Sequence, residues 1–144
     1  FLFLFYLFKK EDNLIKNDTK LILKKYSPGI NIFLDRDYIN KKNNIFLINK
    51  YIIQIPRHYR KNIEIQHNGN IILYRALCNK NNNTYQDWKI LDKKLSITGI
   101  SCVHVNVIKK EFNSGLHIIK SGGPVSSDPI FLEKLEDQDI IINN

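Results

Sequence analysis

The side chains best suited to chemistry in this 144-residue chain are four histidines, because a neutral imidazole can bind a metal ion or haem iron and can transfer a proton. They are His58, His67, His104 and His117. No two of them have the four-residue spacing that places two metal ligands on one helix face. We therefore expect structural or surface roles for the histidines, while a meeting of His104 and His117 on neighbouring strands stays open.

His117 stands inside a short apolar run, Leu116–Ile119, which follows the turn-forming residues 113–115. Apolar residues bounded by turn formers are typical of a buried strand. A buried imidazole needs a hydrogen-bond partner. We expect His117 to be a core histidine whose partner is a backbone group or Asn113.

The acidic and nucleophilic residues do not form a recognisable catalytic pattern. Asp35 and Asp37 flank Arg36 just after an apolar run, a position that favours helix capping over acid–base catalysis or cation binding. Neither the nucleophile motif Gly-x-Ser-x-Gly nor a phosphate-binding glycine motif occurs. We expect a protein that is not an enzyme, with no catalytic, metal-binding or cofactor-binding residue.

Two cysteines, Cys78 and Cys102, are too few for a disulfide framework and lack metal-ligand spacing. Both lie in apolar runs, which favours buried free thiols, and a single bridge between them stays open. Two sequons make Asn17 and Asn82 possible glycosylation sites if the chain is secreted.

The formal charge of +8 is unevenly distributed, because acids outnumber lysines from Glu111 onward. The basic remainder contains one cluster in which cations alternate with an aromatic ring, a combination suited to phosphate contact and base stacking. This possible basic contact patch consists of Arg57, His58, Tyr59, Arg60 and Lys61. It supports an alternative function, a nucleic-acid-binding protein such as an organellar ribosomal component.

Hydrophobic spacing predicts helices early in the chain and strands later. The expected helices are 12–26, 35–39, 57–65 and 85–94. The expected strands are 30–34, 71–78, 95–100, 102–108 and 116–119, with 45–55 ambiguous between helix and strand. An Asn-Gly pair predicts a turn at 67–70. This order of elements predicts an α+β domain in which N-terminal helices pack on a small mixed or antiparallel sheet.

The chain divides into three expected parts. Residues 1–11 are an apolar segment that is either the start of a core helix or the remnant of a signal or anchor. Residues 12–125 form the domain. Residues 126–144 are an acidic C-terminal tail, and its part 133–139 either frays or folds as a short helix against the basic body.

Three short segments resemble motifs of the fasciclin (FAS1) family. Residues 30–39 resemble the family's strand and capped helix, Tyr74 matches the tyrosine of its middle motif, and Asn113 with His117 match its closing motif. Arg75 and Lys120 depart from the histidine and the aspartate of these motifs.

This resemblance implies a single fasciclin-like domain that works as a non-catalytic binding or adhesion module. Its setting would be extracellular or at the cell surface, and its partners would be a protein, a glycan or a membrane surface. One branch of the family handles haem, so a haem-binding fasciclin-like protein is a lesser alternative.

Overall fold

The computed structural model describes residues 20–41, 45–78, 85–102, 104–122, 127–136 and 139–143, and within them the protein is all-β. A short 3-10 helix, η1 (Ile45–Leu47), is the helical element of these residues. The strands are β1 (Ile22–Lys25), β2 (Tyr51–Gln54), β3 (Asn62–His67), β4 (Ile71–Leu77), β5 (Lys89–Leu95), β6 (Val105–Phe112), β7 (Gly115–Lys120), β8 (Ile130–Lys134) and β9 (Ile140–Asn143).

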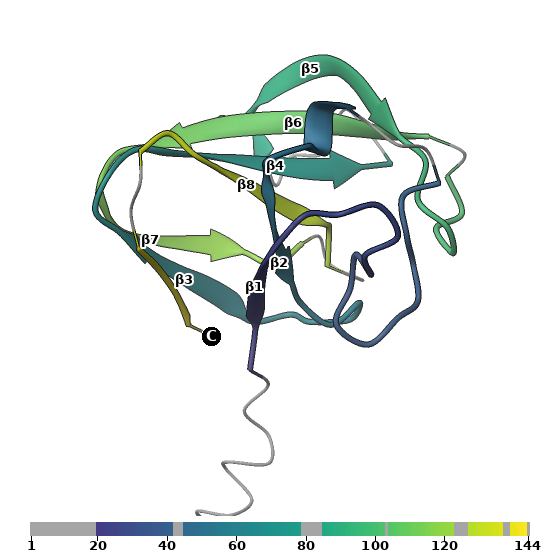
Figure 1. Ribbon diagram of the computed structural model, residues 1–144, viewed down its shortest axis with the longest axis horizontal. Helices are drawn as coiled ribbons and strands as arrows, with labels where there is room; N and C mark the ends of the chain where they lie inside the picture. Colours follow the sequence, from purple (N-terminus) through teal and green to yellow (C-terminus); the bar gives the residue numbers. More distant parts are fainter. Residues whose placement is uncertain are drawn as a thin grey trace, which may run out of the picture.

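The strands form two antiparallel sheets that lie one above the other (Figure 1). The larger sheet has the order β1-β2-β8-β4-β6-β5, and the smaller has the order β7-β3-β9. No helix of the described residues is long and apolar enough to cross a membrane.

The two sheets share one side, where the chain turns from one into the other. β3 leads into β4 through 68–70, and β6 leads into β7 through 113–114. The pairing of β4 with β6 and β8 in the larger sheet is therefore continued by the pairing of β3 with β7 and β9 in the smaller (Figure 1). Corners of this kind, made by strands that change sheets, are typical of sandwiches and barrels.

Buried side chains lie between the two sheets and also on the outer face of the larger sheet. In β3 alternate residues point inward, so that Ile63 and Ile65 are fully buried. In β4 six of seven residues are buried, and in β8 the first three of five are, because the segment before β2 covers their second face. Phe46 from η1, for example, packs edge-on against Tyr74 with ring centroids 4.9 Å apart.

The predicted α+β class is wrong, because none of the four expected helices is present in the described residues. The helix expected at 12–26 lies partly outside those residues, and its last part contains β1. Residues 35–39 contain only a bridge between Phe33 and Arg36. The other two, 57–65 and 85–94, contain a turn leading into β3 and a turn leading into β5.

The helix predictions failed because short apolar runs fit both periods. Ile63 and Ile65 repeat every two residues, which is the strand period, and they point into the core. β5 is an edge strand whose lysines and Asp92 are exposed. Trp88 and Leu91 do pack against the core, but from a turn and from this strand, so their spacing is not that of a helix face. Charged side chains on an edge strand also discourage pairing with another chain.

The expected strands did better. β4 confirms the buried element at 71–78, β7 confirms the strand at 116–119, and the bend at 68–69 confirms the Asn-Gly turn. β6 begins at Val105, three residues later than expected. The strands expected at 30–34 and 95–100 are wrong, because these segments contribute only isolated bridges and the last residue of β5.

The C-terminal segment is part of the folded core. β8 lies between β2 and β4 in the larger sheet, and its Ile130, Phe131 and Leu132 are fully buried. The short helix expected at 133–139 is wrong in its described part, because Glu133 and Lys134 belong to β8 and a bend follows at 135–136. Residues 1–11 lie outside the described residues.

Candidate functional site

A hollow of about 180 Å³ lies where β4, β6 and β7 meet the turn before β5. We call it the aromatic hollow; it is lined by Arg75, Tyr85, Asp87, Trp88, Lys110, Phe112, Ile118, Ile119 and Lys120. Its volume equals that of roughly six molecules of liquid water, enough for one ring-sized group of a ligand.

Three aromatic rings form one wall of the hollow. Trp88 packs edge-on against Tyr85, with ring centroids 5.6 Å apart, and against Phe112, with centroids 6.1 Å apart. A hydrogen bond from the amide of Trp88 to the carbonyl of Tyr85 closes the turn that carries two of the rings. The wall is therefore held by a turn and by β6, which gives it a fixed shape.

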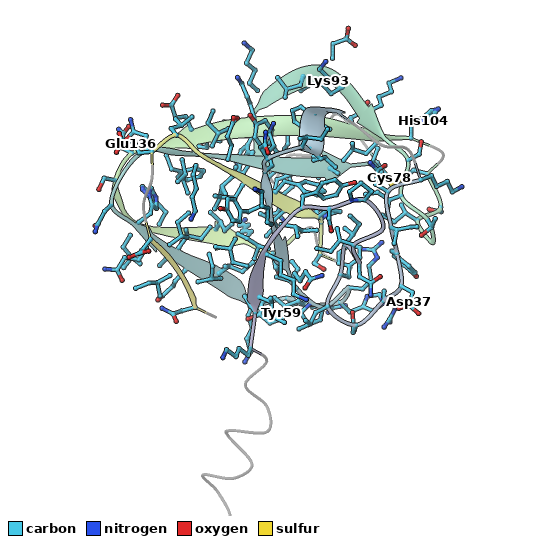
Figure 2. The ribbon with its side chains drawn as sticks, in the orientation of Figure 1. Asp37, Tyr59, Cys78, Lys93, His104 and Glu136 are labelled. Carbon is cyan, nitrogen blue, oxygen red and sulfur yellow. A yellow bond between two sulfur atoms is a disulfide. The ribbon has the colours of Figure 1, made fainter. Side chains whose placement is uncertain are left out.

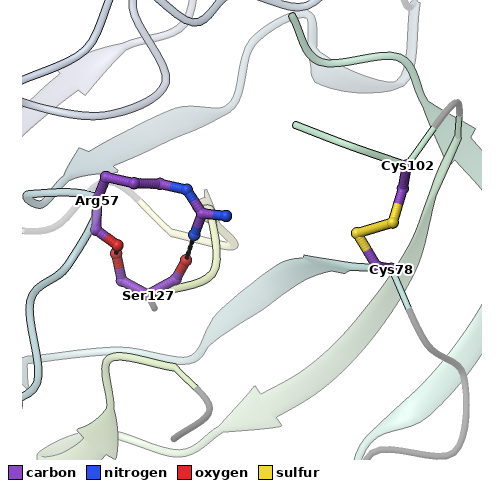
Figure 3. The surroundings of a disulfide bond; sticks show 4 residues. All are labelled: Arg57, Cys78, Cys102 and Ser127. Atoms are coloured by element: carbon purple, nitrogen blue, oxygen red, sulfur yellow. Dashed lines mark hydrogen bonds between the residues drawn. A yellow bond between two sulfur atoms is a disulfide. The ribbon is translucent and has the colours of Figure 1, made fainter. Parts of the chain in front are cut away.

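A disulfide between Cys78 and Cys102 encloses this turn (Figure 3). The bond joins the end of β4 to the segment before β6, and the 24-residue separation between the cysteines contains Tyr85, Trp88 and β5. The expected free thiols are wrong, because the pairing of β4 with β6 brings the two cysteines together.

Two opposite charges stand beside the aromatic wall. The Lys110 ammonium lies 3.4 Å from a carboxylate oxygen of Asp87 and 5.3 Å from the centre of the Phe112 ring. The Asp87 side chain is 78% exposed and that of Lys110 is 35% exposed. An ion pair this exposed is weak, so either partner can exchange it for a ligand group.

Arg75 supplies a buried cation beneath the hollow. Its side chain is fully buried, and its guanidinium donates hydrogen bonds to the backbone carbonyls of Lys120, Ser121 and Asp128. Its Nε has no hydrogen-bond partner among the described residues. Burial lowers the pKa of Arg75, while Tyr85 and Asp128 oppose that shift.

Tyr85 connects this cation to Asp128. The guanidinium carbon of Arg75 lies 5.1 Å from the centre of the Tyr85 ring, and the phenol donates a hydrogen bond of 2.9 Å to the Asp128 carboxylate. Burial raises the pKa of Tyr85, the charge of Arg75 opposes this, and Asp128 adds to it. The phenol therefore stays protonated at neutral pH and serves as a donor.

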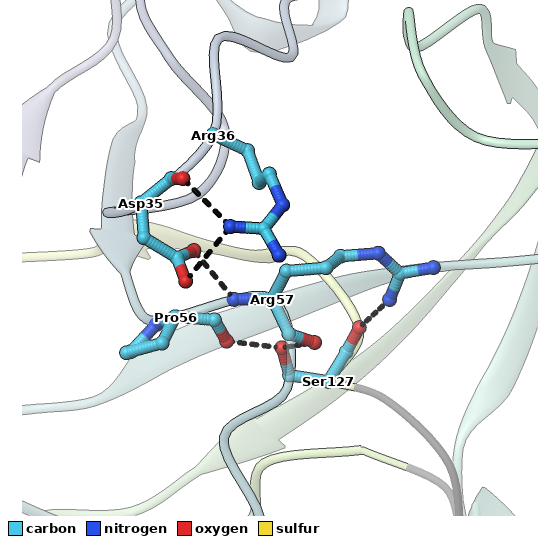
Figure 4. Close-up of polar contacts among 5 residues, drawn as sticks. All are labelled: Asp35, Arg36, Pro56, Arg57 and Ser127. Atoms are coloured by element: carbon cyan, nitrogen blue, oxygen red, sulfur yellow. Dashed lines mark hydrogen bonds and ion pairs between the residues drawn. The ribbon is translucent and has the colours of Figure 1, made fainter.

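The possible basic contact patch does not present its aromatic ring to solvent. Tyr59 is buried, at the lower end of the molecule in Figure 2. The Arg57 guanidinium donates a 2.7 Å hydrogen bond to the carbonyl of Ser127 (Figure 4). It also lies over the Phe33 ring. The exposed members are His58, Arg60 and Lys61. These cations can meet phosphate, but no base can stack on Tyr59.

Asp35 does not cap a helix, so the capping role expected for it is wrong. Its carboxylate accepts the amide of Arg57 at 2.9 Å and pairs with Arg36 at 3.2 Å (Figure 4). It thus joins two loops instead of starting a helix.

The structure brings together His67 and His117, a different pair from the one considered in the sequence. Their rings stack with centroids 5.2 Å apart, while His104 contacts the hydroxyl of Ser96. His117 has the expected partner, the backbone carbonyl of Asn113 at 2.7 Å, but it is only half-buried. The expected fully buried core position is therefore wrong, because β7 forms an edge of its sheet.

The remaining predicted positions divide between the core and the undescribed parts of the chain. Tyr74 is buried and donates a 2.9 Å hydrogen bond to Glu133; burial and this carboxylate raise its pKa. In the described ranges no three metal-ligating side chains gather. Asn17 and Asn82 lie outside the described residues.

Sequence reasoning missed the aromatic hollow. Its rings come from two segments, 85–88 and β6, which only the folded chain brings together. One local signal was present: Arg75 is a charged residue inside the apolar run 71–78, and a buried charge marks a candidate site.

Comparisons with known proteins give a likeness of fold. No protein-family model matches the sequence, and no curated protein matches it. Among solved structures the chain is similar to a beta-glucuronidase from glycoside hydrolase family 2, with a TM-score of 0.53 and 11% identity over 83% of this chain. The chain spans 14% of the length of that structure. At this identity the likeness concerns the fold alone.

Proposed function

We propose that this protein is a non-catalytic binding module that takes a sugar ring of a glycan into the aromatic hollow. The observation that supports the proposal is the combination of an aromatic wall with an exposed, weakly held ion pair in a ring-sized hollow. Binding sites of small ligands combine apolar and aromatic walls with a few polar groups in this way.

The chemistry of a sugar suits both parts of the hollow. A pyranose has faces made of C–H groups, which pack on the rings of Trp88 and Phe112 and lose contact with water. Its hydroxyl groups donate to the Asp87 carboxylate and accept from the Lys110 ammonium. The two groups stand 3.4 Å apart beside the aromatic wall, so one sugar ring can reach both.

An extracellular or lumenal setting belongs to the same proposal. A disulfide persists in oxidising compartments, and glycans are most abundant there as ligands. The Cys78–Cys102 bond also closes the chain segment that carries Trp88. The bond that an oxidising compartment maintains therefore also supports the aromatic wall.

The test is a titration of the folded chain with a panel of monosaccharides and oligosaccharides, followed by tryptophan fluorescence and by calorimetry. Trp88 is the single tryptophan of the chain, so its emission reports directly on the hollow. We expect binding by at least one saccharide, with a shift of this emission.

Two variants accompany the titration. Trp88→Ala should weaken calorimetric binding about tenfold or more, which corresponds to roughly 1.4 kcal/mol. Ile48→Ala, at an exposed apolar residue that does not line the hollow, should leave binding unchanged. Urea unfolding of both variants checks that the fold is intact. Absence of binding to every saccharide, or equal binding by Trp88→Ala, would overturn the proposal.

A further inference from the structure

We propose that the aromatic hollow selects acidic saccharides, in which a carboxylate or a sulfate ester accompanies the sugar ring. This inference rests on the proposed function and adds the class of ligand to it. Three cations, Arg75, Lys110 and Lys120, line the hollow against one carboxylate, that of Asp87.

Lys110 is placed to receive the acidic group. Its ammonium stands near both the Phe112 ring and the Asp87 carboxylate, at the boundary between the aromatic wall and solvent. Because the Asp87 side chain is 78% exposed, water screens its attraction for Lys110. An anion that is held by a ring packed on Trp88 excludes this water and competes well for the same ammonium.

Arg75 adds a fixed positive field beneath the hollow. Its guanidinium is fully buried and is met by the carbonyl oxygens of Lys120, Ser121 and Asp128. These acceptors are neutral groups, and Nε has no hydrogen-bond partner in the described part of the chain. The nearby Asp128 carboxylate, which accepts the Tyr85 hydroxyl, offsets part of the Arg75 charge. A buried cation acts over a longer distance than an exposed one, because less water screens it. An anion in the hollow is therefore stabilised by Arg75 without touching it.

The positions of Lys110 and Arg75 both argue against a neutral sugar as the preferred ligand. A neutral ring gains the contacts with Trp88 and Phe112 but gains no attraction to Lys110 and Lys120, whose two charges exceed that of the Asp87 carboxylate in the lining. An acidic ring of the same shape gains both. The preference is therefore a difference in affinity between two ligands that differ in one group.

The experiment compares matched methyl glycosides by calorimetry at low salt: methyl glucoside, methyl glucuronide and methyl glucoside 6-sulfate. We expect the two acidic ligands to bind at least tenfold more tightly than the neutral one, and the difference to shrink as salt is raised. The glucuronide and the sulfate distinguish a carboxylate from a sulfate ester as the natural acidic group.

Three variants locate the acid-binding group. Lys110→Gln should remove most of the preference for acidic ligands, because it weakens the acids much more than the neutral glycoside, whose hydroxyl the glutamine amide can still meet. Asp87→Asn, at an exposed side chain that folding does not require, should strengthen the binding of both acids. Lys25→Gln is the matched control, because β1 lies at the opposite edge of the larger sheet from β5. It should change nothing.

The outcomes separate the inference from the proposed function. Equal binding of neutral and acidic glycosides, abolished by Trp88→Ala, would overturn acid selectivity and leave the glycan module standing. Acid selectivity that falls equally in Lys110→Gln and Lys25→Gln would show general attraction to a basic surface and would also overturn the inference. Failure of all three glycosides and of the wider panel to bind would end both.

Discussion

At the scale of single residues, the feature with the largest energetic consequence is Arg75. Taking a guanidinium out of water costs several kcal/mol, and the hydrogen bonds to three carbonyls repay this only while all of them are made. Arg75 therefore joins the C-terminal end of β7 to the segment before β8, and it adds positive charge beside the hollow.

We predict that Arg75→Met destabilises the protein by about 3 kcal/mol or more, because one buried and two part-buried carbonyls lose their donor. Urea unfolding followed by circular dichroism measures this. Arg60→Met is the control: Arg60 is exposed, and its loss should change the free energy of unfolding by less than about 0.5 kcal/mol. Equal midpoints for Arg75→Met and wild type would mean that the carbonyls find other partners.

The two buried tyrosines predict a loss of stability in alkali. Burial raises the pKa of Tyr74 and of Tyr85 above the ordinary value of 10.0. Below pH 10 the phenols are protonated in both the folded and the unfolded chain, so their contribution is fully present. Above it the unfolded chain loses protons that the folded chain keeps, and stability falls as pH rises through the folded pKa.

The expected slope is at most about 1.4 kcal/mol per pH unit for each tyrosine. The free energy of unfolding, measured between pH 8 and pH 11.5, should fall less steeply in Tyr74→Phe and Tyr85→Phe than in wild type. All three proteins contain the same lysines, so the difference between the curves isolates the phenols. Parallel curves would contradict the prediction.

Residue-level reasoning from the sequence succeeded where the partner was close in the chain. The bond between His117 and Asn113 spans four residues, and the turn between them is visible in the sequence. The pairing of Trp88 with Phe112 spans 24 residues, and the contact of Arg75 with Ser121 spans 46. Such contacts depend on strand order, which local pattern does not specify.

At the scale of elements, the turn after β5 shows how one glycine sets a local path. Gly99 has φ +78°, and the neighbouring Thr98 hydroxyl accepts the amide of Ile39 at 2.9 Å. A Cβ on Gly99 would lie 2.2 Å from a ring carbon of Tyr38, so the turn and the loop containing Tyr38 pack without space between them. This contact holds the early loop against the end of the larger sheet.

We predict that Gly99→Ala costs more stability than Gly29→Ala. Both glycines have positive φ, +78° and +82°, so each alanine incurs about 1–2 kcal/mol of backbone strain. Only Gly99 also has a ring in the way, and displacing it adds roughly 1–3 kcal/mol. Thermal unfolding of the two variants gives the comparison, and equal losses would show that Tyr38 moves aside freely.

Strands were recognised from the sequence where both faces are covered or where turns bound them. β4 is an apolar run interrupted by Arg75, and β7 is bounded by turn formers, so both were predicted. β3 and β5 were predicted as helices, because six or seven residues contain too few repeats to separate a period of 2 from one of 3.6. The partners of a strand decide between the two periods, and partners are a property of the whole fold.

At the scale of the whole molecule, the two sheets depend on long-range pairing. β8, near the C-terminus, lies between β2 and β4, and the sheet cannot close before most of the chain has been made. The sequence predicted one domain of ordinary size. The residues of β8 were assigned to a C-terminal tail, because acidic residues lie near them in the chain. The α+β class followed from that order of elements and failed with it.

The disulfide gives the last prediction at this scale. It joins the end of β4 to the segment before β6 across 24 residues, and it restricts the unfolded chain more than the folded one, whose strands are already paired. Closing a loop of this length contributes about 3 kcal/mol on the chain-entropy model. The double variant Cys78→Ser, Cys102→Ser should therefore unfold at lower urea concentration by the equivalent of about 3 kcal/mol. A reducing agent should lower wild type to the same midpoint and leave the double variant unchanged.

Because β5 remains paired with β6, the reduced protein should keep its fold and the Trp88–Phe112 contact in the absence of urea. Reduced protein with an unchanged midpoint would show that the loop is already ordered in the unfolded chain, and reduced protein without native circular dichroism would show that the bond, and not strand pairing, holds the larger sheet together.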